Sequence, residues 1–287
     1  MVQGESDGFR GGEPGGVRAV LLAGFHRRTA MPPSGSQAGI LTLDTMDDRA
    51  AHANSFGPAA GIYERGRPPY PSSALDWLLP GGKPRVGVRG GGTGKLTRQI
   101  RDRGLPVTAV DPSEGMRAEL GRVLPDVPAL AGTAESIPLP DAAAEVVLCA
   151  QAWHWVDVGR AVPEVARILS PGGRLGLIWN LRDDREDWVR RLGDIIGSPE
   201  MLRDTEFGAP FGPVRTREFT WTHRLGPDRL LDLVASRSTV ILLPEDDRAA
   251  LLDEVRALIA THPALAGRET FALPYVTQCA QASLPQN

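Results

Sequence analysis

Hydrophobic and polar positions repeat along the chain with two different periods, which predicts strands that alternate with helices. Short apolar runs indicate buried strands, and stretches with apolar residues three and four positions apart indicate helices. Strands alternating with helices are typical of an α/β domain with a mainly parallel sheet. The predicted strands are residues 85–89, 107–110, 127–130, 145–150 and 174–179, and the helices between them are 95–103, 113–123 and 158–169.

The two ends of the chain follow other patterns. Residues 1–45 are rich in Gly, Ser and Pro without sustained periodicity, so we expect a flexible tail before a folded domain at 46–287. Within that domain, residues at about 183–240 alternate weakly, and we expect a small, partly helical cap there. A strand at 219–223, a helix at 246–261 and a final strand at 271–280 complete the predicted order.

Composition and charge narrow the class of protein. The chain has 287 residues, of which 41% are hydrophobic and 23% charged, as in an ordinary globular protein. The formal net charge is -3 and basic residues are dispersed, so we expect no nucleic-acid partner. No run approaches the length of a membrane span, and no metal site is predicted. Cys149 and Cys279 each lie in an apolar run, which indicates reduced thiols and a cytoplasmic location.

A glycine-rich loop follows the first predicted strand of the sheet. Gly90, Gly92 and Gly94 stand at alternate positions, where they allow a tight turn and a close approach of the backbone to a ligand. A phosphate-binding P-loop would need glycine at position 89 and Ser or Thr at 96, where the chain has Arg and Leu. A dinucleotide fingerprint would need glycine at 95, where the chain has Lys. A purely structural turn remains an alternative.

An aspartate provides a second candidate binding group. Asp111 ends the predicted strand 107–110 and lies 21 positions after Gly90. At this position an acidic side chain can accept hydrogen bonds from both hydroxyls of a ribose. Loop and acid together therefore favour a nucleoside-containing cofactor over a structural turn.

These residues resemble the class I S-adenosylmethionine-dependent methyltransferases, and within them the small-molecule group similar to trans-aconitate methyltransferases. The likeness extends from about residue 55 to about residue 280. It rests on the segments 63–71 (YERGRPPYP), 92–97 (GTGKLT), 111–116 (DPSEGM), 132–135 (GTAE), 151–157 (QAWHWVD) and 169–173 (LSPGG).

The resemblance implies a Rossmann-like, doubly wound, seven-stranded and mainly parallel sheet whose last strand is antiparallel. It implies S-adenosylmethionine as cofactor, bound across the carboxyl ends of the strands. The glycines would contact its methionine part, Asp111 its ribose, and the other family positions its carboxylate and adenine. The cofactor-binding residues implied in this way are Tyr63, Arg67, Gly90, Gly92, Gly94, Asp111, Met116, Ala134, Glu135 and Gln151.

The sequence departs from the family at the end of the first predicted strand. The family commonly has an acidic residue two positions before the first glycine, where this chain has Val88. Arg89 follows, in a strand expected to be buried on both faces. Two interpretations stay open: weakened binding of the same cofactor, or a catalytically silent protein of the same fold.

His154 is the candidate catalytic residue. It follows the fourth predicted strand, near the reacting end of the implied cofactor, and could take a proton from the acceptor. A histidine that only orders the loop is the alternative, and Trp153 and Trp155 beside it are pocket walls or core residues. The predicted activity is methyl transfer to a small molecule, with a carboxylic acid as one candidate acceptor.

Overall fold

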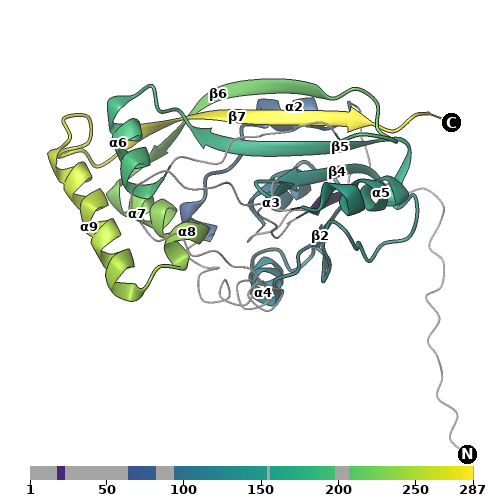
Figure 1. Cartoon of the computed structure of the whole chain (residues 1–287), viewed down its shortest axis with the longest axis horizontal. Helices are drawn as coiled ribbons and strands as arrows, with labels where there is room; N and C mark the ends of the chain where they lie inside the picture. Colours follow the sequence, from purple (N-terminus) through teal and green to yellow (C-terminus); the bar gives the residue numbers. More distant parts are fainter. Residues whose placement is uncertain (1–17, 23–63, 82–93, 154–155, 198–206, 287) are drawn as a thin grey trace, which may run out of the picture.

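A seven-stranded sheet organises the described part of the chain (Figure 1). The structure, a computed structural model, describes residues 18–22, 64–81, 94–153, 156–197 and 207–286. The strand order is β3-β2-β1-β4-β5-β7-β6, and β7 is antiparallel to both of its neighbours. The strands are β1 (Arg18–Leu22), β2 (Val107–Val110), β3 (Ala129–Leu130), β4 (Ala144–Ala150), β5 (Leu169–Arg182), β6 (Arg215–Leu225) and β7 (Phe271–Ser283).

The strand between β2 and β4 corrects one expectation from the sequence. Arg18–Leu22, inside the predicted flexible tail, forms β1 and pairs in parallel with β2 and β4. Its apolar residues suit a strand with a neighbour on each side, because such strands are mostly hydrophobic. The predicted first strand, residues 85–89, lies outside the described residues, as does the rest of the tail. The tail prediction is therefore wrong for these five residues.

Helices cover both faces of the sheet. Alternate residues of β4 divide between two cores, with Val146 and Leu148 on one face and Val147 and Cys149 on the other. The first face is covered by α2, α3 and α4, and the second by α5. The predicted α/β architecture is confirmed. The helices are α2 (Ser72–Leu78), α3 (Lys95–Arg101), α4 (Glu114–Val123) and α5 (Val158–Ile168).

Four further helices gather beyond the carboxyl end of β5, at the left of Figure 1. They bury a core of their own with residues such as Trp188, Leu230 and Val255. The last of them, α9, lies after the predicted cap boundary at 240 and packs on α6 and α7. These helices, called the cap from here on, are α6 (Asp187–Ile196), α7 (Pro227–Ala235), α8 (Ser238–Ile241) and α9 (Glu245–Thr261).

Within the described residues, no helix is long and apolar enough to cross a membrane.

Candidate functional site

Asp111 occupies the position directly after β2, at the carboxyl edge of the parallel strands. Its side chain is buried, and its Oδ1 accepts a hydrogen bond of 2.8 Å from the backbone N–H of Ser113. Arg117 Nη1 donates to the backbone carbonyl of Asp111 at 2.7 Å. Backbone and side chain are thus held from two sides, which orients the carboxylate before any ligand arrives.

Gly94 begins α3 in a conformation that favours glycine. Its φ is 94°, in the left-handed region that side-chain-bearing residues rarely adopt. A Cβ at this position would also lie 3.1 Å from the side chain of Leu124. The last glycine of the predicted loop therefore has a structural requirement for glycine.

Three more of the predicted site residues lie in α4 and in the loop after β3. Met116 lies in the first turn of α4, next to Asp111, and is 6% exposed. Glu135 follows β3 and accepts a hydrogen bond of 2.9 Å from the backbone N–H of Asp157, which ties this loop to the start of α5. The methyl group of Ala134 is fully buried in the core on the α5 face.

Gln151 follows β4 with a φ of 55°, which is uncommon for a residue other than glycine. Its backbone N–H donates to Ile178 at 3.0 Å, and its side-chain Nε2 donates to the backbone carbonyl of Asn180 at 3.3 Å. Strained backbone of this kind persists where the surroundings hold it, and it concentrates at functional sites. Gln151 is thereby fixed to the end of β5.

The structure brings Gly94, Asp111, Met116, Glu135 and Gln151 to the ends of adjacent elements at one edge of the sheet. Tyr63, Gly90, Gly92 and His154 lie outside the described residues.

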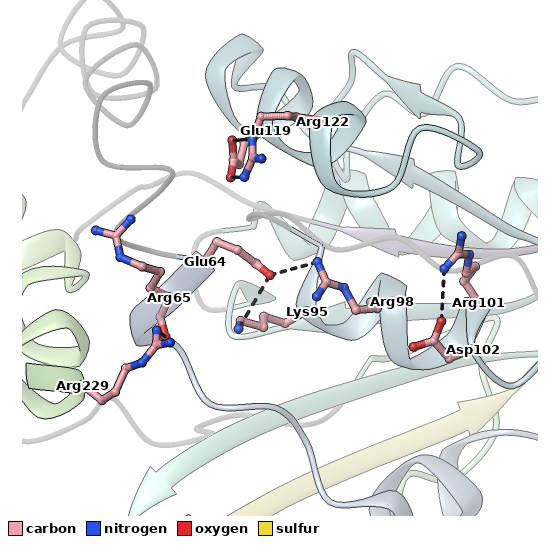
Figure 2. A network of polar contacts seen from close by, with 9 residues as sticks. All are labelled: Glu64, Arg65, Lys95, Arg98, Arg101, Asp102, Glu119, Arg122 and Arg229. Carbon is pink, nitrogen blue, oxygen red and sulfur yellow. Dashed lines mark hydrogen bonds and ion pairs between the residues drawn. The ribbon is translucent and has the colours of Figure 1, made fainter. Parts of the chain in front are cut away.

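The segment that carries Arg67 joins the cap to α3 (Figure 2). Glu64 points between Lys95 and Arg98 of α3, with Glu64 Oε1 at 3.7 Å from Lys95 Nζ and 3.2 Å from Arg98 Nη2. Burial lowers the pKa of Lys95, and the charge of Glu64 partly offsets that shift. The ion pairs hold one end of the segment against α3.

The other end of this segment is fixed to α7. Arg229 Nη1 donates to the backbone carbonyl of Arg65 at 3.3 Å, and Arg67 Nη2 donates to the carbonyl of Ser236 at 3.2 Å. Gly66 lies so close to the backbone of Asp232 that a Cβ would be 2.5 Å from its carbonyl carbon. The glycine of the YERGRPPYP motif is therefore a close-packing residue.

A buried chain of hydrogen bonds behind Gln151 was not predicted from the sequence. Trp221 Nε1 donates to Thr277 Oγ1 at 2.8 Å, and Thr277 Oγ1 donates to Asn180 Oδ1 at 2.6 Å. Asn180 Nδ2 in turn donates to the backbone carbonyl of Pro69 at 2.9 Å. The sequence signal that could have identified Asn180 is its place as a polar residue within an apolar run, because buried polar groups need hydrogen-bond partners. Its partners could not be found without the register of β5, β6 and β7.

A cavity and a possible metal site are the alternatives to this edge of the sheet. A cavity of about 540 Å³ lies at the opposite end of β5 and β7, between Arg174 and Gln281, and none of the predicted site residues lines it. Among the residues that the structure describes, no group of three or more His, Cys, Asp or Glu is arranged to hold a metal ion.

Comparison with known proteins identifies the family. Residues 89–177 match the model of a methyltransferase domain. An uncharacterized methyltransferase of Mycobacterium tuberculosis (strain H37Rv) is 56% identical over 232 residues, which cover 80% of this chain and 96% of that protein. The chain belongs to the class I S-adenosylmethionine-dependent methyltransferases. The family predicted from the sequence is confirmed.

Two further relatives of this methyltransferase extend the comparison. A Serratia marcescens protein named malonyl-[acyl-carrier protein] O-methyltransferase is 33% identical over 192 residues, covering 63% of this chain and 71% of that protein. The solved structure of a type II methyltransferase from Anaeromyxobacter dehalogenans aligns with a TM-score of 0.56 at 24% identity. It covers 76% of this chain and 99% of that chain, and it supports the shared fold.

The described residues fit the cofactor of this family. A buried, oriented carboxylate at Asp111 is an acceptor suited to two neighbouring hydroxyls. Gly94 turns the chain into α3 with a φ of 94°, so the first turn of this helix begins at the same edge of the sheet as Asp111. Gln151 follows β4 and donates to the carbonyl of Asn180, whose side-chain amide in turn holds the segment 64–71 at Pro69.

Proposed function

We propose that this methyltransferase uses S-adenosylmethionine to methylate a small-molecule acceptor, and that the acceptor is a carboxylic acid. The Serratia marcescens relative supports an acid, because the malonyl group in its name carries a carboxylate. Basic residues are dispersed along the sequence and the formal net charge is -3, which argues against nucleic acid as the acceptor. Two buried thiols are compatible with a reducing compartment such as the cytoplasm.

The observation that carries the proposal is the carboxylate of Asp111 at the end of β2. It is buried, and one of its oxygens is held by the backbone of Ser113. A carboxylate with this position accepts hydrogen bonds from the two hydroxyls of a ribose. Met116 supports the same assignment, since it lies in the first turn of α4, the helix that follows Asp111, and offers an apolar contact for an adenine ring.

When bound, S-adenosylmethionine supplies a methyl carbon activated by a sulfonium. The chain then needs chiefly to align the acceptor and to exclude water. Gln151 performs the first task, because its strained backbone and its bond to Asn180 fix its amide at the end of β4. Trp153 contributes to the second, since it is 3% exposed and packs edge-on against Phe207 with ring centroids 5.8 Å apart. His154 remains the candidate for removal of the acceptor's proton.

Calorimetric titration with S-adenosylmethionine tests the cofactor assignment. We expect saturable binding to the full chain and a loss of about tenfold or more in affinity for Asp111→Asn, because hydrogen bonds to a charged acceptor contribute about 1.5–3 kcal/mol. Asp126→Asn is the matched control, since Asp126 is an exposed partner of Arg101 and should bind as the wild type does. Equal affinities for wild type and Asp111→Asn would contradict the assignment.

A second candidate is a cofactor-binding protein that transfers no methyl group. Val88 and Arg89 favour it, because they replace the acidic end of the first family strand, although both lie outside the described residues. Val88→Asp tests the point, and we expect it to bind S-adenosylmethionine more tightly than the wild type. Cofactor binding without methyl transfer in both proteins would support the second candidate.

A further inference from the structure

Three arginines converge on one buried tyrosine where the sheet meets the cap. Arg182 is the last residue of β5 and lies opposite Tyr275 in the antiparallel register with β7. Residues paired in this way have Cβ atoms about 4.5–5.5 Å apart, so the two side chains are neighbours on one face. Arg67 reaches the same region through its bond to the carbonyl of Ser236, and Arg237 follows that residue between α7 and α8.

The guanidinium of Arg182 has an unmet hydrogen-bonding capacity. Its Nη2 donates to the carbonyl of Gly197 at 3.0 Å. Its Nε is shielded from solvent and has no hydrogen-bond partner among the described residues. A buried N–H without an acceptor is unfavourable, and more so when it belongs to a charged group. Arg182 is therefore poised to donate to an acceptor that the described residues do not supply.

Electrostatics at this place favours a negatively charged ligand. The positive charges of Arg67, Arg182 and Arg237 all act on the phenol of Tyr275. Burial nevertheless raises the pKa of Tyr275 to about 12, so the hydroxyl is neutral at pH 7 and keeps its proton to donate. The acidic group that acts on Arg182, Asp184, lies on an exposed turn, where solvent screens it.

We propose that Arg182, with the hydroxyl of Tyr275, forms the subsite that binds a carboxylate or phosphate group of the methyl acceptor, with the positive charges of Arg67 and Arg237 beside it. Arginine donates in a planar fork that matches the two oxygens of either group, and Tyr275 adds an O–H donor. The subsite rests on the proposed function, because it names the part of the acceptor that stays fixed while another part is methylated.

Its place in the fold suits that role. Arg182 ends β5. Gln151 directly follows the adjacent β4 and is bonded to Asn180, two residues before Arg182. Trp221 stacks on Tyr275 with ring centroids 5.2 Å apart and extends the same face of the sheet with an apolar surface. The anionic group of the acceptor thus lies at the cap, and its reacting part lies toward the end of β4.

Anion titration of the full chain, without S-adenosylmethionine and in a buffer free of chloride and phosphate, tests the subsite. Succinate is the carboxylate probe, and glycerol 1-phosphate is the phosphate probe. We expect saturable binding of at least one probe, and the tighter one identifies the anion. Arg182→Gln should weaken it about tenfold or more, because the variant removes a charged donor fork. Tyr275→Phe should weaken it less, since it removes one neutral donor.

The controls separate an anion subsite from a structural role of the cluster. Arg256→Gln removes an exposed arginine paired with Asp253 on α9 and should bind as the wild type does. Circular dichroism and melting temperature show whether Arg182→Gln is folded, and Tyr275→Phe tests the same subsite if it is not. No saturable binding of either probe to the wild type would overturn the proposal, as would equal affinities for wild type and both subsite variants.

The same experiment distinguishes the subsite from the proposed function on which it rests. A chain that binds S-adenosylmethionine but neither anion contradicts the subsite alone. A chain that binds an anion through Arg182 but not S-adenosylmethionine contradicts the cofactor assignment and leaves the anion site standing.

Discussion

Replacing Gly66 with alanine should separate the 64–67 segment from the cap. A Cβ at this position would lie 2.5 Å from the carbonyl carbon of Asp232 and 2.8 Å from the backbone nitrogen of Leu233. It would lie closer still to the carbonyl oxygen of Asp232. These are backbone atoms of α7, which cannot rotate out of the way. To reach an ordinary contact of 3.4 Å, the segment must move by about 0.9 Å. The 3.2 Å bond from Arg67 to Ser236 would then exceed hydrogen-bonding distance.

The magnitude follows from the cost of overpacking. Inserting a methyl group into a packed contact destabilises a protein by about 1–3 kcal/mol. For domains of 150–250 residues, each kcal/mol lowers the melting temperature by about 2–4 °C, so we expect a fall of about 2–12 °C. Thermal unfolding followed by circular dichroism measures it.

Gly193→Ala provides the matched control for this prediction. Gly193 lies inside α6, and a Cβ there would meet nothing within 4 Å. Alanine is better than glycine in a helix by about 0.5–1 kcal/mol, so this variant should melt at or slightly above the wild-type temperature. A Gly66→Ala protein that melts as high as Gly193→Ala would refute the close-packing argument.

Three further predictions concern the buried tyrosine, the hydrogen-bond chain and the strand β1. Burial raises the pKa of Tyr275 to about 12, above the ordinary 10.0, so its contribution to stability is present below pH 10 and is lost as the pH rises toward 12. The difference in phenolate absorbance between wild type and Tyr275→Phe should appear near pH 12, and its appearance near pH 10 in the folded protein would contradict the burial. Thr277→Val leaves Trp221 Nε1 without its acceptor and should lower the free energy of unfolding in urea by about 1–3 kcal/mol, whereas Thr220→Val, at an exposed position of β6, should change it little. Deleting residues 1–45 removes β1 and should abolish cooperative unfolding, whereas deleting residues 1–16 should not; a truncated chain from Met46 that melts like the full chain would show that Arg18–Leu22 is dispensable.

Strong local patterns made much of the fold predictable from the sequence. The strand 107–110 agrees with β2 at both ends, and the helix 158–169 differs from α5 by one residue, because their apolar residues follow one period without interruption. β1 could not be predicted in this way. Its five residues lie among Gly and Pro, and what makes them a strand is pairing with β2 and β4, which are distant in sequence.

The candidate site was predictable where one motif carries one function. Asp111 and Gly94 were found because each stands at a fixed place between a strand and a helix. Arg182 and Tyr275 belong to no motif, and only the antiparallel register of β5 and β7 makes them neighbours. The same holds for Arg67 and Ser236, which meet because the segment after Glu64 docks on the cap.

Methyl transfer from labelled S-adenosylmethionine tests the central claim most directly. The purified full chain is incubated with the labelled cofactor and a metabolite extract, with Asp111→Asn as the matched protein, and small molecules are separated by anion exchange. We predict label in an anionic small molecule with the wild type and a strongly reduced amount with Asp111→Asn. No labelled small molecule from a wild-type chain that binds S-adenosylmethionine would contradict the account and favour a catalytically silent protein.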